Sequence, residues 1–329
     1  MSSSATKVFL TGATGDVGSQ TLALLQATNT PTRVLCRRQA QADSFNQQPG
    51  IEAIVGNLND PVEKLASYMV GCTTFFLLTA AGPEQLAQEL NAIDAAVASE
   101  SVKFIVKISA GDLRPEGNVP WTHSHFHAER HMREQCDKAG LISWTSLRAS
   151  GFMSNFLQSA PAIQKGFLPQ TSGQGRAGWV DTADIAAVAH RVMGDGPKQH
   201  AGQVYVLTGP KLINMPELAT ILSQQIGHRV RYLHLPGSIF KQLVKLGGAD
   251  EFMANGLVAQ FVEIIRPGLE GVDISGDIEK ITGRRATSFE DWVARNRDKF
   301  EGFDIGPYIA SILVAGFAVV GFFVLRRVT

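Results

Sequence analysis

The sequence predicts an α/β fold: a doubly wound parallel sheet (a Rossmann fold), then a smaller, mainly helical C-terminal part and a C-terminal transmembrane helix. Short apolar runs alternate with helical patterns through the first half, as in strand–helix–strand units. A glycine-rich turn follows the first apolar run, and residues 307–325 carry no charge. We therefore divide the chain into 1–150, a part at 151–300 that is interleaved with the sheet, a linker at 301–306 and a membrane segment at 307–325.

The composition is that of a folded protein with balanced charge. The 329 residues are 44% hydrophobic, which allows a substantial core, and 30 basic side chains face 30 acidic ones. This balance provides no strongly basic surface, so no nucleic-acid partner is expected. Cys36, Cys72 and Cys136 are far apart and odd in number, which indicates reduced thiols and a domain that faces the cytosol.

Apolar runs and turn residues place the expected elements in order. Six strands are expected first: Val8–Leu10, Thr32–Cys36, Ile51–Val55, Thr73–Leu78, Phe104–Ile108 and Ser143–Leu147. Helical spacing predicts the helices between them: Gln20–Gln26, Pro61–Met69, Glu84–Glu100 and Phe126–Lys138. An irregular segment is followed by a helix at Ile185–Met193, a strand at Val204–Leu207, and helices at Pro216–Ile226, Ser238–Leu246, Phe252–Ile265 and Phe289–Lys299.

The turn Thr11–Gly18 lies between the first predicted strand and the first predicted helix. A turn in this place brings backbone N–H groups and the positive end of a helix toward a pyrophosphate. Gly12 permits the tight turn, Gly15 leaves room for the phosphate, and Gly18 lets the helix pack closely on the strand. The sequence therefore predicts a dinucleotide site formed by Gly12, Thr14, Gly15, Asp16, Val17 and Gly18.

Other polar residues follow the predicted strands at the same edge of the sheet. Because the carboxyl ends of parallel strands meet at one crevice, we expect further cofactor contacts from Arg37, Arg38, Asn57, Thr79 and Ser109. An arginine after the second strand suits the 2′-phosphate of NADP(H), whereas an acidic residue suits the ribose of NAD(H). The nearest acidic residue is Asp43, so NADP(H) is favoured. Solvated surface arginines and an ordinary loop serine are the alternatives.

Four of the eight histidines lie close together, at His123, His125, His127 and His131. His127 and His131 are four residues apart and would share one face of a helix. Because no second cluster of ligand residues accompanies them, no metal site is expected. A histidine here or Glu129 could donate a proton near a bound dinucleotide, and surface histidines are the alternative.

Asp181 and Asp184 precede the helix predicted at Ile185–Met193. Aspartate is a frequent N-cap because its carboxylate accepts hydrogen bonds from free backbone N–H groups. We therefore expect Asp184 to start this helix rather than to act in catalysis.

The apolar segment at 307–325 predicts a membrane anchor. Its 19 residues would form a helix of about 28 Å, close to the roughly 30 Å hydrocarbon core of a bilayer. The alternative is a last helix docked on the domain, but such a helix normally keeps a polar stripe. We expect a single-pass C-terminal anchor with the catalytic domain in the cytosol, and we leave the organelle and the oligomeric state open.

Four stretches together resemble the NmrA-like family of atypical short-chain dehydrogenase/reductases: Thr11–Gly18, Leu147–Asn155, Val180–Ala186 and Thr282–Arg285. The resemblance runs from about Val8 to Phe300. It implies a Rossmann domain that binds NADP(H), with Arg37 at the 2′-phosphate, and a smaller part that binds substrate. Family members include reductases of quinones, isoflavones and other small molecules, and regulators that bind dinucleotide without turnover.

The resemblance also implies substrate contacts. Phe152 and Asn155 match the segment that lines the substrate pocket, so the predicted substrate residues are Ser109, His125, Phe152 and Asn155. The chain lacks the Tyr-x-x-x-Lys acid pair of typical short-chain dehydrogenases, and no lysine occurs at 126–133. The catalytic candidates are therefore His127, Glu129 and His131.

Three functions remain open at this point. The first is an NADPH-dependent reductase that passes hydride to a small lipophilic quinone, enone or imine. The second is a dinucleotide-sensing regulator without chemistry, which the missing acid pair favours. The third is a dehydratase or isomerase on the same fold.

Overall fold

A computed structural model describes residues 6–267 and 273–302. Its central feature is a sheet of seven strands, all parallel, in the order β3-β2-β1-β4-β5-β6-β9. The strands are β1 (Val8–Leu10), β2 (Thr32–Cys36), β3 (Ile51–Val55), β4 (Thr74–Leu77), β5 (Phe104–Ala110), β6 (Ser143–Ala149) and β9 (Gln203–Leu207). The predicted doubly wound parallel sheet is therefore confirmed, and the run at 204–207 is its last strand.

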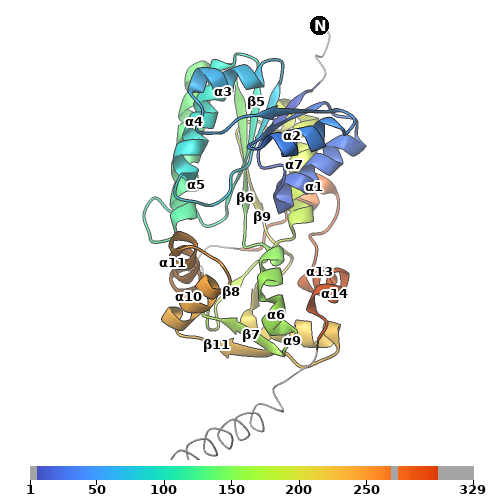
Figure 1. The fold of residues 1–329 in the computed structure, drawn as a ribbon, viewed down its shortest axis with the longest axis vertical. Helices are drawn as coiled ribbons and strands as arrows, with labels where there is room; N and C mark the ends of the chain where they lie inside the picture. The colour runs from blue at the N-terminus through green and yellow to red at the C-terminus, as the bar shows by residue number, and fades with distance from the viewer. Residues whose placement is uncertain (1–5, 268–272, 303–329) are drawn as a thin grey trace, which may run out of the picture.

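Helices cover both faces of this sheet (Figure 1). One face carries α1 (Asp16–Ala27), α2 (Gln39–Asn46), α7 (Thr182–Asp195) and α12 (Asp277–Thr282), and the other carries α3 (Val62–Met69), α4 (Gln85–Ala98) and α5 (Pro120–Ala139). The central strands are apolar on both sides, as burial between two helical layers requires. In β4, for example, Phe76 belongs to the core under α1 and α7, while Phe75 belongs to the core under α3, α4 and α5.

The rest of the chain forms a smaller part, in the lower half of Figure 1. It consists of a 3-10 helix (Met153–Ser159), α6 (Ala160–Ile163), β7 (Phe167–Gln170), β8 (Arg176–Ala177), β10 (Ile213–Asn214), α9 (Met215–Ile226), β11 (Arg231–His234), α10 (Gly237–Leu246), α11 (Glu251–Ala259), a π-helix (Gln260–Ile265), α13 (Phe289–Arg295) and α14 (Arg297–Phe300). Aromatic rings dominate its core: Phe156 makes edge contacts with Trp179 and Phe289. Because α7 and β9 return to the large sheet, the two parts interleave along the chain.

Some elements differ from the sequence prediction. The helix expected from Phe126 begins six residues earlier, at Pro120, because proline is well suited to a first helical turn. The helix α2 and the paired short strands of the smaller part were not predicted, and neither was the short helix α8 (Pro197–His200). These elements are too short to show a clear hydrophobic period.

The prediction that Asp184 caps α7 was wrong. Asp181 is the N-cap, and its carboxylate accepts a hydrogen bond of 3.1 Å from the Ala183 backbone N–H. Asp184 lies inside the first turn, where its carboxylate accepts a hydrogen bond of 2.6 Å from the Thr287 backbone N–H. Both aspartates thus have structural partners, which agrees with the expected structural role.

Within residues 6–267 and 273–302, no helix is both long and apolar enough to span a membrane. The predicted membrane segment at 307–325 lies outside these residues, as does most of the predicted linker at 301–306.

Candidate functional site

The glycine turn lies where the strand order of the sheet reverses. β1 lies between β2 and β4, and the chain runs outward from it in both directions, so the ends of β1 and β4 open onto the ligand crevice of this fold. Thr11 fixes the two ends together: its hydroxyl donates to the Leu78 carbonyl at 2.9 Å and accepts from the Leu78 N–H at 3.0 Å. The turn after β1 is therefore held in place by β4.

Glycine is required at two positions of this turn for different reasons. Gly12 has φ +72°, and an added Cβ would lie 2.9 Å from the Leu78 carbonyl oxygen. A Cβ on Gly18 would lie 2.1 Å from the Gly12 carbonyl oxygen, so only glycine lets α1 pack this closely on the turn. A Cβ on Gly15 would lie 3.5 Å from the Gly12 carbonyl oxygen, which is an ordinary contact, so the fold itself does not require glycine there.

The turn leaves the start of α1 open to a ligand. Gly15 is the N-cap of this 12-residue helix and has no side chain to occupy the free N–H groups. Thr14, Gly15 and Asp16 are exposed, whereas Val17 is buried in the core. A helix N-terminus with an exposed glycine at the cap is a site for a pyrophosphate, so these residues fit a dinucleotide.

Two arginines extend the site along the sheet. Arg37 and Arg38 lie between the end of β2 and the start of α2, and both are exposed. No ion pair of either guanidinium with a carboxylate occurs within the described part of the chain. The nearby Asp43 accepts a hydrogen bond from Gln39 at 2.7 Å. The positive charge is therefore free to meet a phosphate. Asn57, in contrast, shapes its own turn, because its side chain accepts from the Asn59 N–H at 3.0 Å.

Thr79 and Ser109 lie at the ends of the neighbouring strands, as expected. Thr79 follows β4, and its hydroxyl donates to Glu89 Oε1 at 2.6 Å. Ser109 is the second-to-last residue of β5, is 3% exposed, and lies opposite Arg148 of β6. The Thr79 hydroxyl thus belongs to a buried polar cluster, whereas the buried Ser109 hydroxyl lies near Glu129 without a hydrogen bond in the described part of the chain.

Glu129 belongs to a buried ion-pair cluster. Its carboxylate is 2.8 Å from Arg148 Nη2 and 3.1 Å from Arg133 Nη2, and it accepts from the Ser146 hydroxyl at 2.5 Å. Burial alone would raise the pKa of Glu129, but the hydrogen bonds from Arg148 and Ser146 outweigh it and lower the pKa. Glu129 is therefore ionised at neutral pH and carries no proton to donate.

The histidines of α5 have separate surroundings. The His127 ring packs on the ring of His123, with centroids 4.3 Å apart, and the His131 Nε2 atom lies 2.6 Å from Asp94 of α4. His125 instead lies beside a buried ion pair: its Nδ1 atom is 2.8 Å from Lys107 Nζ, which is itself 3.0 Å from Glu89 Oε2. No group of three or more metal-ligating side chains occurs in residues 6–267 and 273–302.

Phe152 and Asn155 enter the smaller part of the molecule. Phe152 follows β6, pairs with Val180 through an isolated bridge, and is partly buried against the core under α1 and α7. Asn155 is exposed in the 3-10 helix. These residues lie beyond the carboxyl end of the sheet, on the side where the smaller part begins.

Sequence reasoning missed three residues near the crevice. Lys107 and Glu89 are fully buried. In the sequence, the pair could have been suspected from a lysine inside the apolar strand β5. Asp112 follows β5 and accepts a hydrogen bond of 2.8 Å from Gln260 of the π-helix. Burial raises the pKa of Asp112. In the sequence, this residue could have been found as an acidic residue three positions after Ser109.

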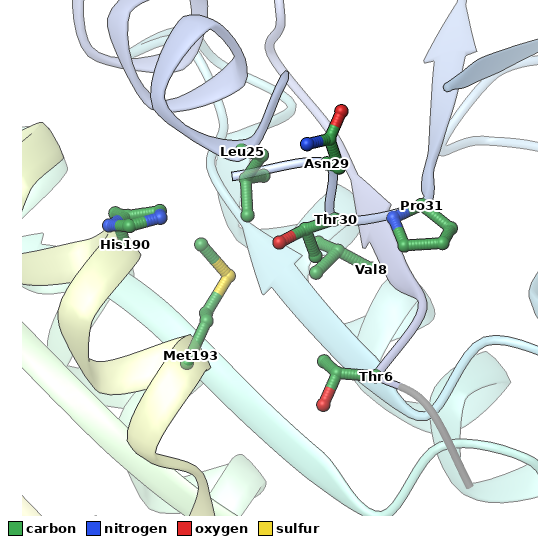
Figure 2. A pocket seen from close by; sticks show the side chains of 9 residues that line it. Thr6, Val8, Leu25, Asn29, Thr30, Pro31, His190 and Met193 are labelled. Carbon is green, nitrogen blue, oxygen red and sulfur yellow. The ribbon is translucent and has the colours of Figure 1, made fainter. Parts of the chain in front are cut away.

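A separate cavity of about 270 Å³ lies at the opposite edge of the sheet (Figure 2). It is lined by Val8 at the start of β1, Pro31 before β2, Leu25 of α1, and His190 and Met193 of α7. None of the predicted site residues reaches it, since they follow the other ends of the strands. The crevice above the glycine turn therefore remains the candidate site.

The fold and this turn define a Rossmann-type dinucleotide-binding protein. Residues 4–293 match the model of the NmrA-like family, and the chain belongs to this family.

Two curated relatives span nearly the whole described fold. The chain is 28% identical over 297 residues to an NAD(P)H azoreductase of Xenophilus azovorans, covering 89% of this chain and 99% of the relative. It is 29% identical over 293 residues to quinone oxidoreductase 2 of Escherichia coli strain K12, covering 87% and 97%.

Solved structures agree with this assignment. The crystal structure of an NADPH-dependent quinone oxidoreductase from Escherichia coli, complexed with NADPH, has a TM-score of 0.77 at 28% identity and covers 88% of this chain and 99% of its own. A triphenylmethane reductase of Citrobacter sp. has a TM-score of 0.75 at 23% identity, covers 88% and 99%, and shares the fold.

Proposed function

We propose that this protein is an NADP(H)-dependent oxidoreductase that transfers hydride to a small lipophilic acceptor of the quinone, enone or imine type. The observation that carries the proposal is the open glycine turn at the reversal point of the sheet, with two free arginines beside it. Full-length similarity to proteins named as azo and quinone reductases supports the reaction class.

The cofactor would be held by groups already in place. The turn from Gly12 to Gly18 would hold the pyrophosphate at the N-terminus of α1, and Arg37 with Arg38 would hold the 2′-phosphate. The bound cofactor would supply the hydride, and the protein would orient it toward the acceptor.

The acceptor would lie beyond the end of β5, between Ser109, His125 and Phe152. Among the catalytic candidates, Glu129 is ionised and bound to Arg148, and His131 is bound to Asp94. His127 packs beside His123 on α5, the helix that also carries His125. We therefore favour a hydrogen bond from a histidine, with water as the source of the proton.

The proposal is tested by NADPH oxidation with a panel of quinones, enones, imines and azo dyes. The full-length protein should oxidise NADPH only when an acceptor is present. A dinucleotide-sensing regulator is the second candidate, because the Tyr-x-x-x-Lys pair is missing. Tight NADPH binding without turnover on any acceptor, together with capture of a specific partner protein, would support the regulator instead.

We also propose that residues 307–325 anchor the protein in a membrane with the catalytic domain in the cytosol. The uncharged sequence of this segment supports the anchor, and a membrane would concentrate a lipophilic acceptor. Deleting residues 307–329 should move the protein to the soluble fraction after carbonate washing. Unchanged membrane association of the deletion variant would contradict the anchor.

A further inference from the structure

A fully buried ion pair contacts His125, one of the residues proposed to line the acceptor site, and has no part in the function proposed above. Lys107 of β5 and Glu89 of α4 have side chains that are 0% and 1% exposed, and their charged atoms are 3.0 Å apart. Replacing such a pair with apolar residues is often neutral or stabilising, so stability alone does not explain its presence.

The pair touches one ring, that of His125 on α5. Lys107 Nζ lies 2.8 Å from His125 Nδ1, and Glu89 Oε1 lies 3.4 Å from the same nitrogen. An ammonium group can donate hydrogen bonds but cannot accept them, so the shorter contact requires Nδ1 to be the unprotonated nitrogen. The proton of the neutral ring is therefore on Nε2. This nitrogen faces the Gln85 amide, whose Nε2 lies 3.2 Å away, so the amide must turn its oxygen, which has no other partner among the described residues, toward the Nε2–H.

The surrounding charges favour the same form. Burial and the charge of Lys107 lower the pKa of His125, while Glu89 and Glu129 oppose them with a smaller effect. Asp112 after β5 also lies near this ring. The Thr79 hydroxyl donates to Glu89 at 2.6 Å and so helps to hold the carboxylate toward Lys107.

We propose that Lys107 is a positioning residue that holds His125 as a neutral imidazole with its proton on Nε2. His125 then carries a hydrogen-bond donor on Nε2 that does not change form across physiological pH, and a bound acceptor would take this donor in place of the Gln85 amide. Glu89 balances the buried charge of Lys107, and Thr79 ties the pair to the end of β4. The role of His125 toward an acceptor rests on the proposed reductase function, whereas its protonation form does not.

The experiment is a pH titration of the full-length protein, labelled with ¹⁵N-histidine, in detergent micelles with NADP⁺ bound. Correlations of the two ring nitrogens should show His125 neutral, with the proton on Nε2, from pH 8 down to below the ordinary histidine pKa of about 6.5. Titration of His125 near that value, or a proton on Nδ1, would overturn the proposal whatever the activity.

The decisive variant is Lys107→Met, which keeps an unbranched side chain, one atom shorter, and removes the charge. His125 should then take up a proton and pair with Glu89, so its pKa should rise. With menadione as acceptor, kcat/KM should vary with pH around the new His125 pKa, whereas the wild-type profile should be flat there. Lys103→Met is the matched control, because Lys103 is exposed and its ammonium group donates to the Glu100 carbonyl on the surface.

The remaining outcomes separate the positioning role of Lys107 from the proposed reductase function. If Lys107→Met does not fold, the double variant Glu89→Gln/Lys107→Met removes both charges, and its His125 should no longer hold its proton on Nε2 alone. An unchanged tautomer in that variant, or a pH profile of Lys107→Met equal to the wild type, would overturn the positioning role. If NMR shows His125 neutral with its proton on Nε2 but no acceptor is turned over, the result would contradict the reductase function alone.

Discussion

Asp112 Oδ2 accepts a hydrogen bond of 2.8 Å from Gln260 Nε2, which joins the end of β5 to the π-helix of the smaller part. The other end of the same amide accepts from Trp121 Nε1 of α5, also at 2.8 Å. One side chain of the smaller part therefore binds two elements of the Rossmann part beside the crevice. π-Helical turns are often found at functional sites, and here the turn places Gln260 between the two parts.

The Asp112–Gln260 bond predicts a characteristic pH dependence. Burial raises the pKa of Asp112 in the folded protein, so ionisation of this carboxyl opposes folding. Asp112→Asn keeps an oxygen that accepts from Gln260 but cannot ionise. The free energy of unfolding of Asp112→Asn relative to wild type should increase as the pH rises from about 4, by about 1.4 kcal/mol for each unit of pKa shift, and then level off.

Urea denaturation of both proteins between pH 4 and pH 8 measures this difference. Asp43→Asn is the control, because Asp43 is exposed and its stability difference should not change in the same way. A relative stability of Asp112→Asn that falls with rising pH would contradict the assignment.

Glu129 predicts the opposite pH dependence. Its carboxylate is 3% exposed and pairs with Arg148, so Glu129→Gln should lower the free energy of unfolding at neutral pH by about 3–5 kcal/mol. Because its folded pKa is lowered, the loss should shrink as the pH falls below the ordinary glutamate pKa of about 4.3. Denaturation curves of the variant and wild type check both points.

Glu134→Gln is the matched control on the same helix. Glu134 is half-exposed and 3.8 Å from Arg130, so its loss should cost no more than about 0.5 kcal/mol. Equal effects of the two glutamine variants would show that the Glu129 cluster is not a structural ion pair.

The glycines of the turn predict separate effects on folding and on binding. Gly18→Ala would place a Cβ 2.1 Å from the Gly12 carbonyl oxygen, so it should destabilise the fold by about 1–3 kcal/mol. Gly15→Ala meets only a contact of 3.5 Å, so its melting temperature should be unchanged. Its methyl group would occupy the path of the pyrophosphate, and the Kd for NADPH should rise at least about tenfold.

Melting temperatures and NADPH titrations of the glycine variants separate these effects. Gly82→Ala is the control, since nothing lies within 4 Å of its Cβ position. Unchanged NADPH affinity in Gly15→Ala would move the cofactor away from this turn.

Arg37 predicts which dinucleotide is bound. If its guanidinium holds the 2′-phosphate, Arg37→Ala should raise the Kd for NADPH about 10- to 100-fold, since a charge-assisted hydrogen bond contributes about 1.5–3 kcal/mol. The Kd for NADH should change little, because NADH lacks that phosphate. Arg130→Ala on α5 should alter neither value, and equal losses for both dinucleotides would argue against the assignment.

The fold was predictable because its signals are long or repeated. Seven apolar runs and one glycine turn determine a parallel sheet with a crevice at a known edge. The site was harder to predict because its polar groups meet only in space. Lys107, Glu89 and His125 come from three elements, and nothing in their sequence spacing relates them. Glu129 was predicted as a catalytic acid from its place in the His123–His131 segment. Its partners Arg148 and Ser146 belong to β6 and keep its carboxylate ionised, which the sequence spacing does not reveal.

The most direct test is a single turnover of the protein loaded with NADPH. Anaerobic addition of menadione to the full-length protein should convert the bound NADPH to an equal amount of NADP⁺. The loss of NADPH fluorescence measures this conversion. Gly15→Ala at the same concentrations should convert less, in proportion to the NADPH that it still binds. Bound NADPH that persists with menadione and with every other acceptor of the panel would contradict a reductase.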